Sequence, residues 1–166
     1  MDTIKNFTNN QRSWRYRIFA ITWFAYAGFY FGRKNFSVAM PSMANELGYS
    51  HQDLAMVISA FSFTYMAGQF LNGFLADRFS PRVIVGIGLI MAAIANFFMG
   101  WTGTLSVFIF LMGVNGLAQS TGWPGLLKNM SAWFGQKERG VVLSWWSTCY
   151  VVGAFGATIF ATYCIT

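Results

Sequence analysis

At Phe31-Gly-Arg-Lys-Asn-Phe-Ser-Val-Ala-Met-Pro41, two adjacent cations, Arg33 and Lys34, lie inside a long apolar stretch. The stretch covers residues 18–40 and contains no Asp or Glu. At about 1.5 Å per residue, it is long enough to cross a bilayer as a helix. Charges at membrane depth are costly, so they usually face a cavity and mark a functional site. The alternative is that both side chains extend to the headgroups near Pro41.

The composition is that of a membrane protein. The 166-residue chain is 55% hydrophobic and 10% charged, whereas a soluble domain has about 25% charged residues. Its net charge of +6 is explained by topology rather than by a nucleic-acid partner, because Lys5, Arg12, Arg15 and Arg17 precede the first apolar stretch. Residues 1–17 are therefore expected to form a basic arm on the cytoplasmic side of the membrane.

Five spanning helices are predicted, over about 18–40, 52–75, 83–101, 105–134 and 141–165. Ser50 and Asp53 have the spacing of a capping box and predict the start of the second helix. Pro124 lies in the path of the fourth helix and predicts a kink there. The expected fold class is all-α transmembrane, with residues 18–166 forming an incomplete amino-terminal bundle that lacks a sixth helix and a second half.

The basic turns are expected to fall on one side of this bundle. They are the arm, the turn at 77–82 and the turn at 136–140, whereas the opposite loops carry Glu46 and Asp53. The positive-inside rule therefore predicts an integral, multi-pass protein with a cytoplasmic amino terminus. Because the chain stops after an odd number of spans, we expect a fragment, a separately encoded half or a truncated gene.

Polar side chains recur at helical spacing along three of the predicted helices. They are Tyr26, Tyr30 and Arg33, with Lys34 to the side, on the first; Ser62, Tyr65, Gln69 and Asn72 on the second; and Asn115, Gln119 and Trp123 on the fourth. Lipid would not solvate these groups, so they predict a shared cavity. Asn72 and Asn115 are equally well explained as hydrogen-bonding groups between helices.

A guanidinium in such a cavity favours an anionic substrate. The planar fork of Arg33 can bond two phosphate or carboxylate oxygens, and tyrosine hydroxyls can supply further donors. A buried cation left without an anion is costly, which favours the exchange of one anion for another. We therefore expect an anionic small molecule and inorganic phosphate as ligands, membrane lipid around the helices, and no cofactor or metal.

Several motifs resemble those of a family of transporters. Asn72-Gly-Phe-Leu-Ala-Asp-Arg-Phe-Ser-Pro-Arg82 is similar to the cytoplasmic loop signature of the major facilitator superfamily. Within that superfamily, the chain resembles the organophosphate:phosphate antiporters at Arg33-Lys-Asn-Phe-Ser-Val-Ala-Met-Pro41, at Gly122-Trp-Pro124 and at Trp133-Phe-Gly-Gln-Lys-Glu-Arg-Gly140. The resemblance covers nearly the whole chain and implies transport of an organophosphate, with the inner membrane of a bacterium as the expected location.

The resemblance also implies an architecture and a set of site residues. Two six-helix bundles hold the substrate between them, with one arginine from each, so a carboxy-terminal half, in the same chain or a separate one, is the implied partner. Arg33 matches the amino-terminal arginine. Cavity positions are matched by Tyr26, Tyr30, Tyr65 and Trp123, and positions that lock helix ends to their neighbours by Gly73, Asp77, Arg78 and Arg82.

The chain departs from the family pattern at several positions. Gln69 stands where phosphate carriers usually have a lysine, which leaves the identity of the substrate open. A second proline of the family pattern is missing from Gly122-Trp-Pro-Gly-Leu126, and Tyr150 stands where glycerol-3-phosphate carriers have a histidine.

A carrier is the first functional hypothesis. The second is a sensor or partner-binding membrane protein that kept the fold without transport. An enzyme finds little support, because the single histidine, His51, lies in a predicted loop and the sequence offers no nucleophile–base set.

Overall fold

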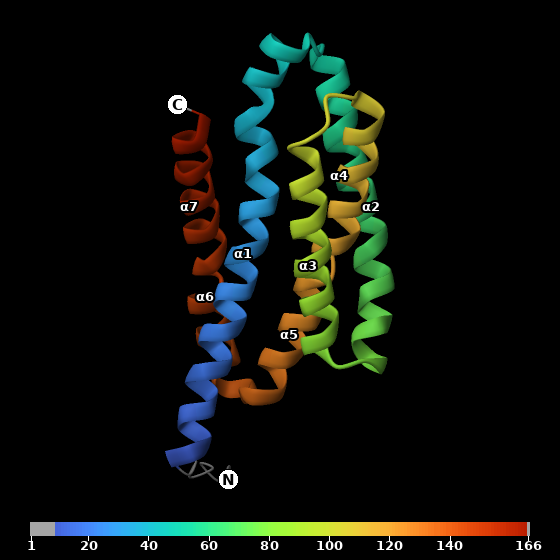
Figure 1. The fold of residues 1–166 in the computed structure, drawn as a ribbon. Helices are drawn as coiled ribbons and strands as arrows, with labels where there is room; N and C mark the ends of the chain where they lie inside the picture. Colours follow the sequence, from blue (N-terminus) through green and yellow to red (C-terminus); the bar gives the residue numbers. More distant parts are fainter. Residues whose placement is uncertain (1–8, 166) are drawn as a thin grey trace.

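The computed structural model describes residues 9–165, which fold almost entirely into helices (Figure 1). Within this range there are seven α-helices: α1 (Asn9–Leu47), α2 (His51–Arg78), α3 (Pro81–Met99), α4 (Leu105–Gln119), α5 (Gly122–Trp133), α6 (Gln136–Trp146) and α7 (Thr148–Ile165). The predicted all-α class is confirmed. Lys5, which contributes to the predicted basic arm, lies outside the described residues.

Four stretches of the described chain are long and apolar enough to cross a membrane: α2, α3, α4 with α5, and α6 with α7. α1 has 39 residues, but its mean hydropathy is lowered by polar residues that include Arg33 and Lys34. The outer surface of the bundle is apolar. Phe24, Phe63 and Phe155 are between 68% and 70% exposed, which is typical of side chains that contact lipid rather than water.

The first helix is longer than predicted at both ends. It begins at Asn9, so the basic arm is helical from there, and it continues through Pro41 to Leu47. The predicted end of this helix, at about residue 40, is wrong, because the proline that follows removes only one backbone hydrogen bond and the turns around it are held by packing of Phe36 and Met43 in the core. The helix ends at Gly48, whose φ of 69° is the left-handed conformation that glycine adopts most readily.

The second helix begins at the predicted cap. The side chain of Ser50 accepts a hydrogen bond from the backbone N–H of Asp53 at 3.2 Å, and the Asp53 carboxylate accepts one from the backbone N–H of Ser50 at 3.0 Å. Two donors that a helix start would leave unsatisfied are thereby paired.

The fourth and fifth predicted helices are each divided in two. The fourth is interrupted at Ser120 and Thr121, which keep right-handed helical backbone angles, so α4 and α5 form one apolar stretch with a break near Pro124, where the sequence predicts a kink. Pro124 explains this break, because its ring clashes with the carbonyl four residues earlier, at Ser120. The fifth starts at Gln136, and Ser147 separates α6 from α7. The Ser147 hydroxyl donates to the carbonyl of Leu143 at 2.8 Å, a bond that competes with regular helix geometry.

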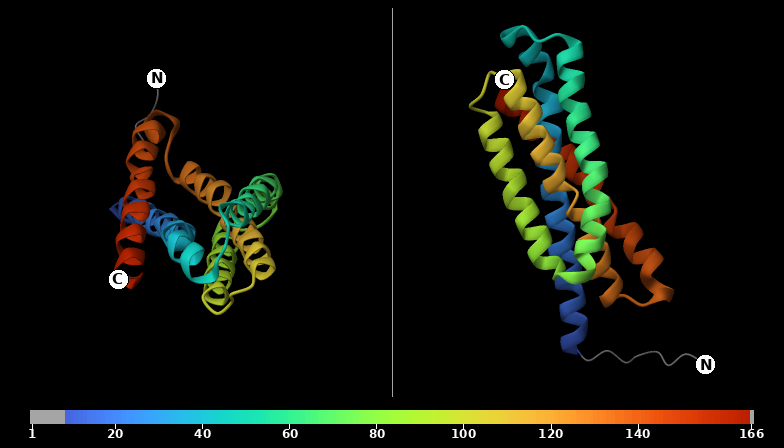
Figure 2. Two further views of the ribbon diagram at one scale, coloured as in Figure 1. Left: turned by 90° about the horizontal axis from the view of Figure 1, so that it is seen from above. Right: turned by 90° about the vertical axis from the view of Figure 1, so that its right-hand side faces the viewer.

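Viewed from above, α1 lies between α6 and α7 on one side and α2, α3 and α4 on the other (Figure 2). The most extensive contacts join α2 to α4 and α1 to α7. Two hydrophobic cores result. The lower core, near the amino-terminal end, includes Phe29 and Trp146, and the upper core includes Phe36 and Phe108. Arg33 lies on α1 between Phe29 and Phe36, and therefore at the level where the two cores meet.

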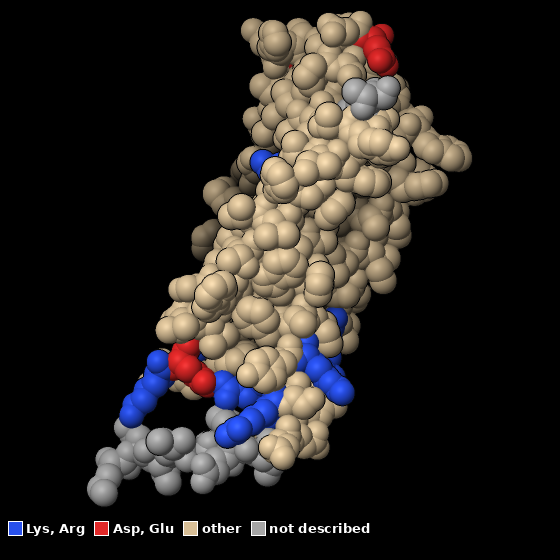
Figure 3. Space-filling model, turned by 90° about the vertical axis from the view of Figure 1, so that its left-hand side faces the viewer, with Lys and Arg blue, Asp and Glu red and all other residues tan. Residues whose placement is uncertain are grey.

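Positive charge gathers at one end of the molecule (Figure 3). The start of α1, the α2–α3 turn and the α5–α6 turn all lie there, as Figure 1 shows, and they carry Arg12, Arg15, Arg17, Arg78, Arg82, Lys137 and Arg139. We refer to these residues as the basic end. The α1–α2 turn lies at the opposite end, next to the last turn of α1, which carries Glu46.

Candidate anion-binding site

Arg33 is held by groups from three helices. Its Nε donates a hydrogen bond to the side-chain oxygen of Gln119 on α4, at 2.9 Å. Its Cζ lies 5.1 Å from the ring centroid of Tyr30, 5.5 Å from that of Phe61 and 4.9 Å from that of Tyr65, so three aromatic rings surround the guanidinium. Such cation–π contacts stabilise the charge without neutralising it.

No carboxylate offsets the charge of Arg33 in the described part of the chain. The ion pairs found between residues 9 and 165 are Arg15 with Glu138 and Lys128 with Asp77, and Arg33 is in neither. A half-buried guanidinium without an anionic partner is a natural place for an anionic ligand.

A chain of amide groups continues from Arg33 into the protein. Gln119 donates from Nε2 to the side-chain oxygen of Asn115 at 3.0 Å, and Asn115 donates from Nδ2 to the carbonyl of Gly32 at 3.1 Å. Asn96 on α3 donates to the same Asn115 oxygen at 3.4 Å. The chain therefore ties α1, α3 and α4 together beside the candidate ligand site.

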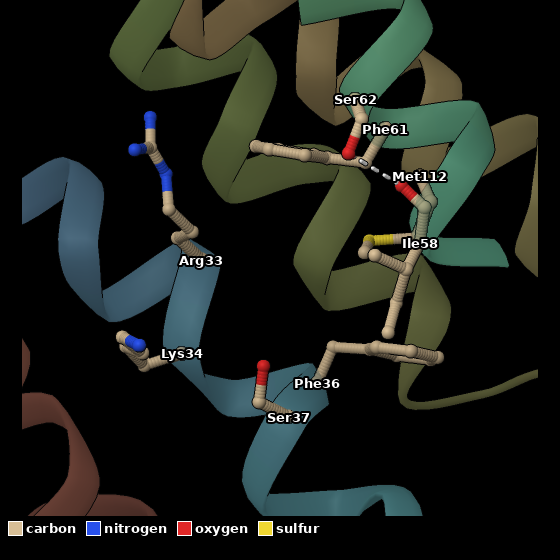
Figure 4. Close-up of a pocket in the computed structure, with 8 residues that line it drawn as sticks. All are labelled: Arg33, Lys34, Phe36, Ser37, Ile58, Phe61, Ser62 and Met112. Carbon is tan, nitrogen blue, oxygen red and sulfur yellow. Dashed lines mark hydrogen bonds between the residues drawn. The ribbon is translucent and has the colours of Figure 1, made fainter. Parts of the chain in front are cut away.

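A pocket of about 250 Å³ lies between α1, α2 and α4 (Figure 4). It is lined by Arg33, Lys34, Phe36, Ser37, Ile58, Phe61, Ser62 and Met112. Two cations and two hydroxyls thus share its wall with apolar side chains. A volume of this order suits a small solute, since sites for drug-sized ligands begin at about 300 Å³.

An aromatic cluster adjoins the groups around Arg33. It contains Tyr26, Tyr30, Trp123, Trp146 and Tyr150, whose ring centroids in contact are 5.1–6.2 Å apart. The cluster joins α1, α5, α6 and α7, and Tyr30 belongs both to it and to the ring of aromatic groups around Arg33.

The structure brings together most of the residues that the sequence predicts for the site. Tyr26, Tyr30, Arg33, Tyr65 and Trp123 are linked through contacts of their rings or of the guanidinium. Lys34 lines the pocket from α1. Tyr26, Tyr30, Tyr65 and Trp123 are not among the lining residues, and neither is Gln69, which lies on α2 one helical turn beyond Tyr65 and is half-buried.

Asn72 has a structural role in this arrangement. It is 8% exposed, and its side-chain amide donates to the Ser120 hydroxyl at 2.7 Å. The bond joins α2 to the break between α4 and α5, which is the interhelical role that the sequence left open for this residue. Asn115 also bonds across helices, but its partner is the residue next to Arg33.

The predicted locking residues lie near the basic end. Asp77 pairs with Lys128 of α5 at 3.0 Å, and the Lys128 ammonium also donates to the carbonyl of Ala76. Gly73 is half-buried one turn before Asp77, and Arg78 and Arg82 are exposed. A second tie joins α1 to α6 through the ion pair of Arg15 with Glu138.

Lys128→Gln is expected to loosen the last turn of α2 while changing the free energy of unfolding by less than about 1 kcal/mol, because the ion pair with Asp77 is exposed. Hydrogen exchange of backbone amides in residues 75–79 measures this loosening. Arg78→Gln is the matched control, since it removes a neighbouring cation outside this pair. Equal acceleration of exchange in both variants would contradict a specific role for Lys128.

The sequence did not predict every contact within the site. Gln119 carries a signal, since it is four residues after Asn115 on a predicted polar stripe, but its pairing with Arg33 was not predicted. Phe61 and Asn96 carry none, because an isolated phenylalanine or asparagine in an apolar helix does not indicate what it contacts in the folded bundle.

Comparison with known proteins agrees with the predicted resemblance. The family model described as Major Facilitator Superfamily matches residues 22–166. A probable hexose phosphate transport protein of Chlamydia trachomatis is 37% identical over 84% of this chain and 31% of its own length. The glycerol-3-phosphate transporter of Bacillus subtilis is 35% identical over 84% of this chain and 32% of its own length. The membrane sensor protein UhpC of Escherichia coli is 34% identical over 86% of this chain and 32% of its own length. The chain thus spans about a third of the length of these curated relatives.

Proposed function

The chain belongs to the major facilitator superfamily, and on that premise we propose that it forms part of a membrane transporter for an anionic organophosphate or a similar small solute. Transport would proceed by exchange with inorganic phosphate through alternating access. The substrate contacts would be made by Arg33, Tyr30, Tyr26, Tyr65, Gln69, Trp123 and Lys34. The similarity to proteins named as hexose phosphate and glycerol-3-phosphate transporters supports this substrate class.

The proposal rests on the burial of Arg33 and on the absence of a carboxylate beside it in the described residues. Its guanidinium is half-buried at the meeting of two hydrophobic cores, without a carboxylate partner among the described residues. Moving this charge through alternating access without an anion would leave it poorly solvated, whereas a bound phosphate would offset it. Exchange is therefore favoured over movement of a single solute.

We further propose that the basic end faces the cytoplasm, in accordance with the positive-inside rule. Lipid would then contact the exposed phenylalanines, and a carboxy-terminal six-helix half would complete the site with a second arginine. The relatives reported above are named as transport or sensor proteins, and we propose no enzymatic activity for this chain.

Phosphate efflux from proteoliposomes tests the exchange mechanism. The chain is reconstituted together with a carboxy-terminal six-helix half, and the vesicles are loaded with labelled phosphate. External phosphate or glucose 6-phosphate is expected to accelerate efflux severalfold, because the returning carrier must bind an anion. Efflux at the same rate with and without external anion would contradict exchange.

A sensor is a second candidate, because the relatives named as membrane sensor protein are about as similar to this chain as the transporters are. In that case, the chain would bind a phosphorylated ligand without moving it. Ligand binding in detergent together with an absence of exchange in proteoliposomes would favour the sensor over the carrier.

A further inference from the structure

We propose that Gln119 is a positioning residue for Arg33, and that it leaves the two terminal nitrogens of the guanidinium to face the anion. The first part concerns the protein alone, and the second rests on the proposed function. Gln119 is 1% exposed and Asn115 is 0% exposed, so two amides are buried in the bundle beside the site. Buried amides are costly unless they are hydrogen-bonded, and these two bond to each other.

The direction of every hydrogen bond in this chain of amides is determined by its ends. The Nε of Arg33 can only donate, so Gln119 must present its oxygen to it. The carbonyl of Gly32 can only accept, so Asn115 must present its amide nitrogen to it. The remaining groups, the nitrogen of Gln119 and the oxygen of Asn115, then pair correctly at 3.0 Å. Neither amide can be reversed without losing bonds at both of its contacts.

The chain of amides therefore holds two adjacent residues of α1, each at one point. Gln119 holds the side chain of Arg33 at Nε, and Asn115 holds the backbone one residue earlier, at Gly32. Positioning and ligand binding would therefore be done by different residues, positioning by Gln119 and Asn115 and binding by Arg33. Gln119 would act through Arg33 and would not touch the anion itself.

The same contact selects the edge of the guanidinium that is left for a ligand. A guanidinium can offer a carboxylate or phosphate either its Nε and one Nη or its two Nη atoms. Gln119 occupies Nε, and three aromatic rings lie around Cζ. The pair of Nη atoms remains, and Figure 4 shows them at the end of the side chain farthest from its own Cα. The anion is therefore expected to bind end-on to Arg33.

Nitrogen NMR of arginine-labelled chain in lipid nanodiscs tests the positioning role without any transport assay. The Nε–H signal of Arg33, assigned by its loss in Arg33→Lys, is expected to exchange slowly with water. Gln119→Met should accelerate that exchange by about tenfold or more, because a hydrogen bond to a charged group is lost. Asn72→Leu is the matched control: it removes another buried amide bond near the α4–α5 break and should leave the Nε–H signal unchanged.

Addition of phosphate tests the second part. Phosphate is expected to shift the Cζ–Nη signals of Arg33 while its Nε–H remains slow to exchange. Gln119→Glu is a second variant, in case Gln119→Met does not fold. Its carboxylate still accepts a hydrogen bond from Nε, so the Nε–H should stay protected. Because the carboxylate also offsets the positive charge of Arg33, the apparent affinity for phosphate should fall by about tenfold or more.

Two results would overturn the proposal. The first is that the Nε–H of Arg33 exchanges with water at the same rate in Gln119→Met as in the unchanged chain. The second is that added phosphate makes the Nε–H exchange faster, which would mean that phosphate displaces Gln119 from Nε. A different result would speak against the proposed function alone. If Nε–H is protected by Gln119 while neither phosphate nor glucose 6-phosphate shifts any Arg33 signal, the positioning role stands and the anion-binding role fails.

Discussion

Arg33→Lys is expected to lower the initial rate of phosphate exchange by about a hundredfold. Lysine keeps the positive charge but loses the planar fork, so it can neither give two parallel hydrogen bonds to one anion nor keep the Nε contact with Gln119. The rate is measured as uptake of labelled phosphate by proteoliposomes that contain the chain, a carboxy-terminal half and internal phosphate.

Lys34→Gln provides the comparison for this experiment. Lys34 lines the same pocket from the neighbouring position on α1 and contributes charge without a fork. Its loss should reduce the initial rate of phosphate exchange by less than about tenfold, because the interaction of a solvent-screened charge with an anion is weak. Uptake that is unchanged in Arg33→Lys would exclude Arg33 as the group that binds the anion. Equal losses in both variants would indicate a general effect of positive charge instead.

Gly153→Ala is expected to destabilise the bundle by about 1–3 kcal/mol, through overpacking between α1 and α7. A Cβ at Gly153 would lie 2.9 Å from the Cα and 3.0 Å from the carbonyl oxygen of Ala27, and backbone atoms cannot turn away as a flexible side chain can. The variant would also push α7 away from Tyr30, whose Cβ is 3.2 Å from the added atom. Unfolding in denaturing detergent, followed by tryptophan fluorescence, measures the change.

Gly156→Ala is the control within the same helix. Its added Cβ would have the side chain of Phe31 as its nearest contact, at 3.8 Å, which is an ordinary van der Waals distance. Alanine is favoured over glycine in a helix interior, so this variant should be neutral or more stable by up to about 1 kcal/mol. Equal destabilisation of the two variants would show that the α1–α7 contact at Gly153 is not unusually close.

Local sequence rules account well for the fold at some positions and fail at others. The capping box at Ser50 and Asp53 involves only neighbouring residues, and it forms as predicted. The end of α1 does not follow the same kind of rule. Pro41 is a local stop signal, but packing on both sides of it carries the helix on to Gly48.

The site was predictable where one helix face was enough to define it. The spacing of Tyr26, Tyr30 and Arg33 predicts that they point the same way, and their contacts agree with this. The bond between Arg33 and Gln119 joins side chains from α1 and α4, and helical periodicity says nothing about which residues of two helices lie at the same height. The position of Gln69 outside the pocket was unpredictable for the same reason.

The ion pair of Arg15 with Glu138 has a mechanical consequence for Arg33. The two arginines are eighteen residues apart on the uninterrupted helix α1, which is five complete turns and about 27 Å. Their Cα atoms therefore lie on the same face of α1, while their side chains reach partners on α6 and α4. Because a straight helix transmits rotation about its axis, turning α1 far enough to separate Arg15 from Glu138 would also swing Arg33 away from Gln119. The ion pair with α6 and the hydrogen bond with α4 therefore both oppose rotation of α1 about its axis.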